Sequence, residues 1–219
     1  QTMLIPTKEK LPANHHVRMR AFYHPHFEVG GDYYDVITLG KNEIGFCIAD
    51  VSGKGISAAI LMSNFQANLR ALYAEGQSLT KTLRRLNERV MNSAKGEKFI
   101  TLFIARYHYR NRQLNYVNAG HNPPFLFELK SKKLTQLSSG CVGMGMLDEL
   151  PFVNEATIQL DEPSKLFCYT DGLVEVIRDS GVEFGTKDLE KEISNHKSLE
   201  ENIQSIIEGQ KIMEGSTSI

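Results

Sequence analysis

An α+β fold of layered sheets and helices is predicted by the order in which hydrophobic patterns follow one another along the chain. Strand-like runs come first, two helix-like stretches follow, then a second series of strand-like runs, and finally two more helix-like stretches. Elements grouped in this way argue against alternating βαβ units. The chain has 219 residues and no shift in composition divides it, so we expect one main domain.

The first half of the chain carries the longest helical patterns. A strand candidate covers residues 17–23, and the nearly all-apolar run from Ile44 to Val51 is typical of a strand buried on both faces. Apolar residues at helical spacing predict a helix from about Ile56 to Glu75. Gly76 fits a helix stop, and Ser78 fits the N-cap of a second helix that reaches about Ala94.

The second half returns to strand patterns before its last two helices. A polar link at 110–112 predicts a hairpin between its flanking strands, and a glycine-rich turn covers 140–145. The expected strands are 100–109, 113–119, 124–129, 134–137, 152–160 and 165–169, and the expected helices are 187–195 and 199–213.

Composition and charge exclude several classes of function. With 41% hydrophobic and 23% charged residues and a formal charge of -1, the chain has no basic field that would recruit nucleic acid, and we expect no direct membrane contact either. The basic face from Lys81 to Arg89 lacks interleaved aromatic residues, so it predicts a solvated helix surface. The three cysteines form no CxxC or Cys/His pattern, which favours a reducing cytoplasm over a disulfide framework or a zinc site.

Three aspartates share one local context. Asp32 follows Gly30 and Gly31, Asp50 ends the apolar run, and Asp171 ends another strand just before a glycine. A strand end fixes the position of a side chain, and a neighbouring glycine allows close approach of a ligand. Asp-Gly is also common in plain turns, and each aspartate taken alone is more consistent with a turn.

Carboxylates that share one pocket raise one another's pKa unless cations compensate. Mg²⁺ and Mn²⁺ prefer such oxygen ligands, and a pair of these ions activates water and holds a phosphoryl oxygen. If the three aspartates converge, their chemistry suits the hydrolysis of phosphate esters.

At these residues the sequence resembles the metal-dependent (PPM) protein serine/threonine phosphatases, in particular the SpoIIE/RsbU-like bacterial branch. The motifs that carry the resemblance are collinear over about residues 1–190: GGDYYDV at 30–36, ADVSGKGISAAILM at 49–62, TLFIARY at 101–107, NAGHNPP at 118–124 and YTDGLVE at 169–175. The resemblance implies two antiparallel sheets packed together and flanked by helices on both outer faces.

The resemblance also implies a site for two Mn²⁺ or Mg²⁺ ions and a metal-bound water as nucleophile. By motif position Asp50 is expected to bridge the metals, Asp32 to bind one and Asp171 the other, and the carbonyl of Val51 to be a further ligand. These aspartates are the expected catalytic residues.

Three other residues are candidates for supporting roles. Asp35 is expected either to orient a metal-bound water or to lie on an element surface. Lys54 is either a contact for substrate phosphate or an exposed loop lysine, since its Gly-Lys-Gly turn lacks the spacing of a nucleotide-binding loop. His121 is a candidate acid near the leaving group, but the adjacent Pro123-Pro124 favours a structural role.

The two ends of the chain depart from the family pattern. Residues 1–12 resemble the end of a linker helix from an upstream sensor or receiver domain, and residues 13–219 are expected to form the phosphatase domain. Family members end with a strand that opens on an Asp-Asp motif, which is absent before Ile219. We therefore expect a domain truncated at its C-terminus, without its final strand, that binds one metal ion more weakly than a longer chain.

The predicted function is the hydrolysis of phosphoserine or phosphothreonine on a regulatory protein. In this branch the substrate is commonly an anti-anti-sigma factor of the STAS type, within partner switching. The alternative is a pseudophosphatase that binds such a partner without turnover, an interpretation that the missing fourth acid keeps open.

Overall fold

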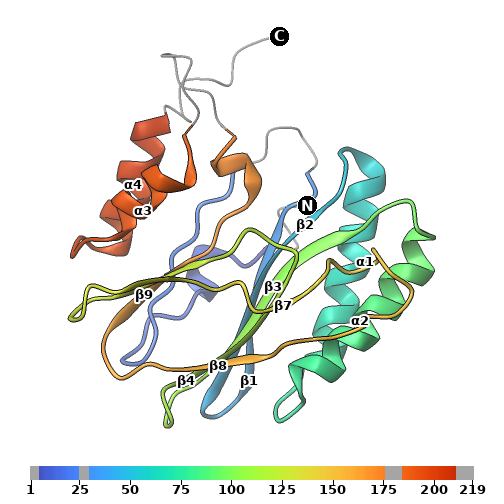
Figure 1. Ribbon diagram of the computed structural model, residues 1–219, viewed down its shortest axis with the longest axis horizontal. Coiled ribbons are helices and arrows are strands. Elements are labelled where there is room, and N and C mark those ends of the chain that lie inside the picture. The colour runs from blue at the N-terminus through green and yellow to red at the C-terminus, as the bar shows by residue number, and fades with distance from the viewer. Residues whose placement is uncertain (1–4, 25–29, 176–183, 211–219) are drawn as a thin grey trace.

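The molecule is a four-layer sandwich in which two sheets pack face to face between two pairs of helices (Figure 1). The structure is a computed structural model and describes residues 5–24, 30–175 and 184–210. This arrangement confirms the α+β prediction and the sandwich that the family resemblance implied.

The larger sheet consists of long strands from the first half of the chain and short strands from the second. Its order is β1-β2-β3-β4-β7, and β8 also pairs with β4. All pairs are antiparallel except β4 with β7. The strands are β1 (Tyr33–Gly40), β2 (Glu43–Val51), β3 (Ile100–His108), β4 (Gln113–Ala119), β7 (Gly140–Cys141) and β8 (Ala156–Gln159).

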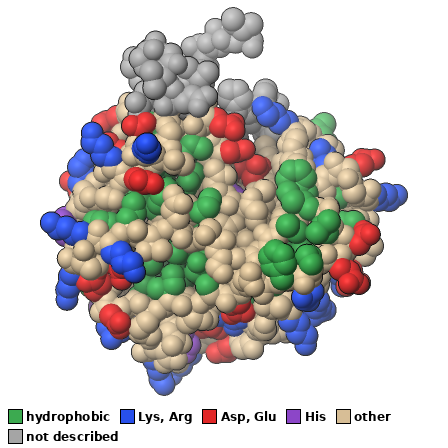
Figure 2. All heavy atoms as spheres, viewed as in Figure 1, with side chains coloured by type: hydrophobic (Ala, Val, Ile, Leu, Met, Phe, Trp, Pro, Cys, Tyr) green, Lys and Arg blue, Asp and Glu red, His purple; other side chains and the backbone are tan. Residues whose placement is uncertain are grey.

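The helices α1 (Ile56–Leu72) and α2 (Leu79–Ala94) cover one face of the larger sheet. Their apolar sides meet the sheet in a core that includes Phe65, Leu83 and Ile104. Burial of this apolar area is the main force that holds the layer in place. In Figure 2 exposed hydrophobic side chains gather on the right of the view, the side on which Figure 1 draws these helices.

The smaller sheet has the order β6-β5-β9, with β5 (Phe125–Glu128), β6 (Leu134–Gln136) and β9 (Ser164–Phe167). One face packs on the larger sheet through Phe103, Leu126 and their neighbours. The other face packs against α3 (Thr186–Ile193) and α4 (Leu199–Gln210). The Lys165 ammonium of β9 donates hydrogen bonds of 2.8 Å to the Asn195 carbonyl and to Asn202 Oδ1, which ties the strand to these helices.

Most predicted elements are confirmed, and some bounds differ. Helix α1 ends at Leu72 rather than near residue 75, and the strands predicted at 152–160 and 165–169 are shorter. Residues 211–213, where the last helix was expected to end, and residues 1–4 of the expected linker helix lie outside the described residues. Residues 8–10 form a short 3-10 helix, η2.

The strand predicted at residues 17–23 is wrong. These residues are extended, but their only β-type contact among the described residues is an isolated bridge between Ala13 and Arg18. Side chains of strand type are therefore not sufficient here, because no neighbouring strand offers a ladder of hydrogen bonds. Sequence reasoning also missed β1, which begins directly after Asp32.

Among the described helices, none combines the length and hydrophobicity that crossing a bilayer requires.

Candidate metal centre

The register of the larger sheet brings two of the predicted aspartates together. Tyr33 of β1 pairs with Ala49 of β2 in antiparallel register, so Asp32, one residue earlier, comes beside Asp50, one residue later. Side chains alternate between the faces of a strand, so Asp50 shares a face with Ile48 and Phe46, which pack toward the smaller sheet. Asp50 therefore lies at the end of the space between the two sheets.

Gly31 fits tightly against the segment that carries Asp50. A methyl group in place of the Gly31 hydrogen would lie 2.8 Å from the Val51 carbonyl oxygen and 2.9 Å from Asp50 Oδ1. Both distances are too short for a carbon atom, so the close approach of these two chain segments requires glycine at this position. The Val51 carbonyl oxygen and Asp50 Oδ1, both predicted as metal ligands, therefore lie on the same side of Gly31.

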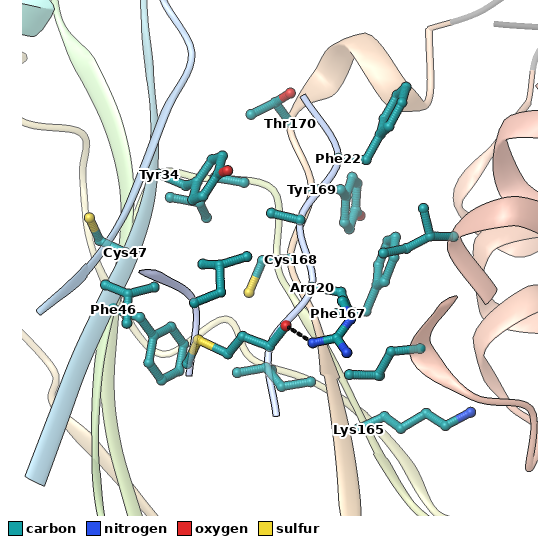
Figure 3. Close-up of a pocket in the computed structure, with 18 of the residues that line it drawn as sticks. Arg20, Phe22, Tyr34, Phe46, Cys47, Lys165, Phe167, Cys168, Tyr169 and Thr170 are labelled. Atoms are coloured by element: carbon teal, nitrogen blue, oxygen red, sulfur yellow. Dashed lines mark hydrogen bonds between the residues drawn. The ribbon is translucent and has the colours of Figure 1, made fainter. Parts of the chain in front are cut away.

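Asp171 reaches the site from the smaller sheet. The chain leaves β9 at Phe167 and continues to a short 3-10 helix, η3 (Asp171–Leu173), in which Asp171 is the first residue. All three aspartates line one cleft between the sheets, together with Gly53 and Lys54. In Figure 3, Tyr34 lies on the β1 side of this cleft and Thr170 lies on the β9 side.

The carboxyl groups act on one another electrostatically. Burial and then the charge of Asp171 raise the pKa of Asp32 to about 6, although a hydrogen bond with the Thr170 side chain opposes the shift. Burial raises the pKa of Asp50 to about 7, and the charges of Asp32 and Asp171 add to this effect. Glu175 raises the pKa of Asp50 further. The three aspartates therefore share one electrostatic environment, which is costly when all of them are ionised.

The donor atoms suit hard divalent cations. Carboxylate and carbonyl oxygens are the ligands that Mg²⁺ and Mn²⁺ prefer, and a cation would relieve the repulsion among the aspartates. Within the described ranges no three His, Cys, Asp or Glu side chains are gathered closely enough to form a metal cage. The cleft thus has oxygen donors of the type that these ions prefer.

Sequence reasoning missed three residues of this cleft. Thr170 and Glu175 belong to the YTDGLVE motif, so their closeness to Asp171 in sequence is a signal that could have identified them. Tyr23 had no such signal. Its buried hydroxyl has no hydrogen-bond partner among the described residues, and burial and the charge of Asp32 raise its pKa to about 12.

Asp35 is a buried residue of β1. Its carboxylate is 1% exposed, so the expected surface role is wrong. It accepts hydrogen bonds of 2.7 and 2.8 Å from the Arg70 guanidinium and one of 2.5 Å from the Tyr33 hydroxyl. These contacts tie Asp35 to Arg70 of α1, and its predicted role toward a metal-bound water stays a prediction.

Lys54 is an exposed residue of the loop that connects β2 to α1. The glycines on either side, Gly53 and Gly55, both have φ of 83°, a conformation that strongly favours glycine. The Gly-Lys-Gly sequence is therefore explained by the shape of the loop, and the lysine side chain remains at the cleft.

His121 joins the two sheets at the same end of the molecule. Its Nδ1 lies 2.9 Å from the Thr101 hydroxyl of β3, and its Nε2 lies 3.1 Å from the Tyr169 carbonyl oxygen. Since that carbonyl only accepts, Nε2 carries the hydrogen and Nδ1 accepts from Thr101. Burial lowers the pKa of His121 to about 4. Both nitrogens are occupied, which supports the structural role.

Replacing His121 with Gln is expected to change how stability depends on pH. Below a pH of about 6.5 the imidazole of His121 takes up a proton in the unfolded chain but stays neutral in the folded protein. The wild-type protein should therefore lose stability as the pH falls from about 6.5 toward 4. The difference between those two pKa values corresponds to about 3 kcal/mol. Urea unfolding of both proteins at several pH values measures the effect, and parallel curves would contradict it. Comparing the two proteins cancels the contribution of the carboxylates they share.

Comparison with known proteins decides the family. The family model for Stage II sporulation protein E (SpoIIE) matches residues 40–216. The chain belongs to the SpoIIE family. This membership confirms the resemblance drawn from the five motifs.

Relatives of this SpoIIE-family chain include phosphatases. Phosphoserine phosphatase RsbU of Bacillus subtilis (strain 168) is 29% identical over 199 residues, which cover 90% of this chain and 58% of RsbU. The chain thus spans a little over half the length of that relative.

Two solved structures share the fold. The SiaA-PP2C domain of Pseudomonas aeruginosa superposes with a TM-score of 0.73 at 15% identity, covering 86% of this chain and 76% of that domain. RsbX in complex with magnesium gives a TM-score of 0.63 at 18% identity, covering 83% of this chain and 80% of RsbX. The chain therefore has the fold of PP2C-type phosphatase domains.

Proposed function

We propose that this domain hydrolyses phosphoserine or phosphothreonine on a regulatory protein, with two Mn²⁺ or Mg²⁺ ions as cofactors. The observation that carries the proposal is that Asp32, Asp50 and Asp171, which come from separate parts of the chain, line one cleft. Burial there raises the pKa values of Asp32 and Asp50, and the neighbouring carboxylate charges add to both shifts. When bound, such ions supply an activated water and stabilise negative charge on the phosphoryl oxygens.

The residues of the chain have distinct roles in this proposal. Asp50 would contact both ions, Asp32 would hold one and Asp171 the other, and the Val51 carbonyl would be a further ligand. Gly31 keeps the Val51 carbonyl and Asp50 oxygens together, because it offers no side chain that would separate them. His121 holds the two sheets, and hence the aspartates they carry, at a fixed spacing.

The proposed partner is a phosphorylated anti-anti-sigma protein of the STAS type. RsbU is named a phosphoserine phosphatase, and its similarity to this chain supports phosphoserine as the target. We further propose that the domain works in the cytoplasm, under the control of an upstream sensor or receiver domain that is attached through residues 1–12.

Hydrolysis of p-nitrophenyl phosphate and of a phosphoserine peptide tests the reaction. We expect both to require Mn²⁺ or Mg²⁺, to stop when EDTA is added, and to recover when excess metal is restored. Turnover that persists after dialysis against EDTA would contradict a metal-dependent mechanism. A protein that binds Mn²⁺ and a phosphorylated partner but releases no phosphate would instead be a pseudophosphatase.

A further inference from the structure

A basic and apolar surface borders the loop that follows Asp50 and Val51. Lys98 and Phe99 lie just before β3, and Met146 lies in the loop after β7. We call these three residues the rim. Phe99 is 36% exposed and Met146 is 43% exposed, so both offer apolar surface to a partner.

The rim is attached directly to the loop beside the candidate metal centre. The Ser52 N–H donates to the Phe99 carbonyl, and the Phe99 N–H donates to Ser52 Oγ, each at 2.9 Å. The Lys98 ammonium donates to the Ser52 carbonyl at 3.3 Å and lies over Gly53, where an added methyl group would be 2.7 Å away. The loop and the rim therefore form one continuous surface.

Met146 belongs to the same surface. Its thioether lies beside Gly143, and Gly143 and Gly145 contact the backbone of residues 98–100. Met144 and Ile100 exchange two backbone hydrogen bonds of 2.8 Å, which fix the loop after β7 against the start of β3.

Lys98 carries a charge that the described part of the chain does not neutralise. The three ion pairs in that part involve other residues, and the ammonium contacts only the Ser52 carbonyl at a long distance. An unpaired cation beside exposed apolar side chains is typical of a surface that recognises an acidic partner.

We infer that the rim binds the protein substrate next to its phosphorylated residue, with Lys98 facing acidic side chains that flank the phosphoserine. This inference rests on the proposed function. A phosphoserine side chain is short, so a substrate protein whose phosphate reaches Asp50 must also cover the surface beside that residue. Phe99 and Met146 supply apolar contact there, and Lys98 supplies selectivity for charge.

Two synthetic phosphoserine peptides test the inference, one with Glu and one with Lys on both sides of the phosphoserine. We expect the wild-type protein with Mn²⁺ to prefer the acidic peptide about threefold in kcat/KM, the range of an exposed ion pair. Lys98→Glu should invert the preference, and Lys98→Met should remove it. Lys41→Glu makes the same charge change in the β1–β2 turn, at the end of β2 opposite Asp50, and should keep the wild-type ratio.

The outcomes separate this inference from the proposed function. If the wild-type protein hydrolyses both peptides but Lys98→Glu leaves their ratio unchanged, the inference is overturned alone. If it hydrolyses neither peptide, the proposed function fails and the inference fails with it. If Lys98→Glu changes the oligomeric state in sedimentation and not the ratio, the rim is a contact between copies of the chain, and the inference is also overturned.

Discussion

Replacing Asp50 with Asn should lower the Mn²⁺-dependent turnover of p-nitrophenyl phosphate by more than about a hundredfold. Groups that only orient a metal ligand typically contribute 10- to 100-fold, and Asp50 is proposed to bind both ions directly. The amide keeps the size of the carboxylate but loses its charge. The steady-state rate and the Mn²⁺ affinity from calorimetry should therefore fall together.

Thermal unfolding of the Asp50→Asn variant tests whether such a loss of activity comes from misfolding. In metal-free protein the charge of Asp50 is unfavourable, because burial and the charges of Asp32 and Asp171 raise its pKa to about 7. The Asn variant should therefore unfold at a temperature equal to or above that of the wild type. Asp148→Asn, an exposed position, serves as the control for activity. An Asp50→Asn protein with a tenth or more of the wild-type activity would refute the proposed role.

Replacing Arg70 with Met should reduce the free energy of unfolding by about 3 kcal/mol. The side chain of Asp35 is fully buried, whereas that of Arg70 is half exposed. Removal of the guanidinium leaves a buried carboxylate without its ion pair, and that uncompensated charge is the source of the cost. Equilibrium unfolding in urea measures the change, provided that the slope with denaturant stays constant.

Two further variants assign that loss to the ion pair. Arg85→Met, which removes an exposed arginine from α2, should change stability by less than about 0.5 kcal/mol. Asp35→Asn in the Arg70→Met background should restore part of the loss, because the buried charge is then gone. If Arg70→Met and Arg85→Met lower the free energy of unfolding equally, the burial of Asp35 adds nothing to the contribution of the Arg70–Asp35 ion pair.

The three aspartates that line the cleft are easier to find in the sequence than the elements around them. Asp32, Asp50 and Asp171 stand out because strand ends and glycines occur together, and collinear motifs link them. Helical periodicity predicts α1 and α2 equally well, and the short polar link at 110–112 predicts the β3–β4 hairpin.

Other features depend on contacts that a linear pattern does not record. Residues 17–23 have strand-type side chains, but the described parts of the chain offer them no neighbouring strand with which to pair. Asp35 resembles its acidic neighbours in the motif, yet its partner, Arg70, is 35 residues away and on another element. Tyr23 enters the cleft only because the extended N-terminal segment passes along it.

The hydrogen bonds of His121 leave neither of its ring nitrogens available for proton transfer. An imidazole with both nitrogens engaged and a pKa near 4 stays neutral throughout the range in which cells operate. Rate profiles between pH 6 and 8 should then contain no inflection from this histidine. In the proposed reaction, protonation of the departing serine oxygen would then depend on solvent or on another group in the cleft.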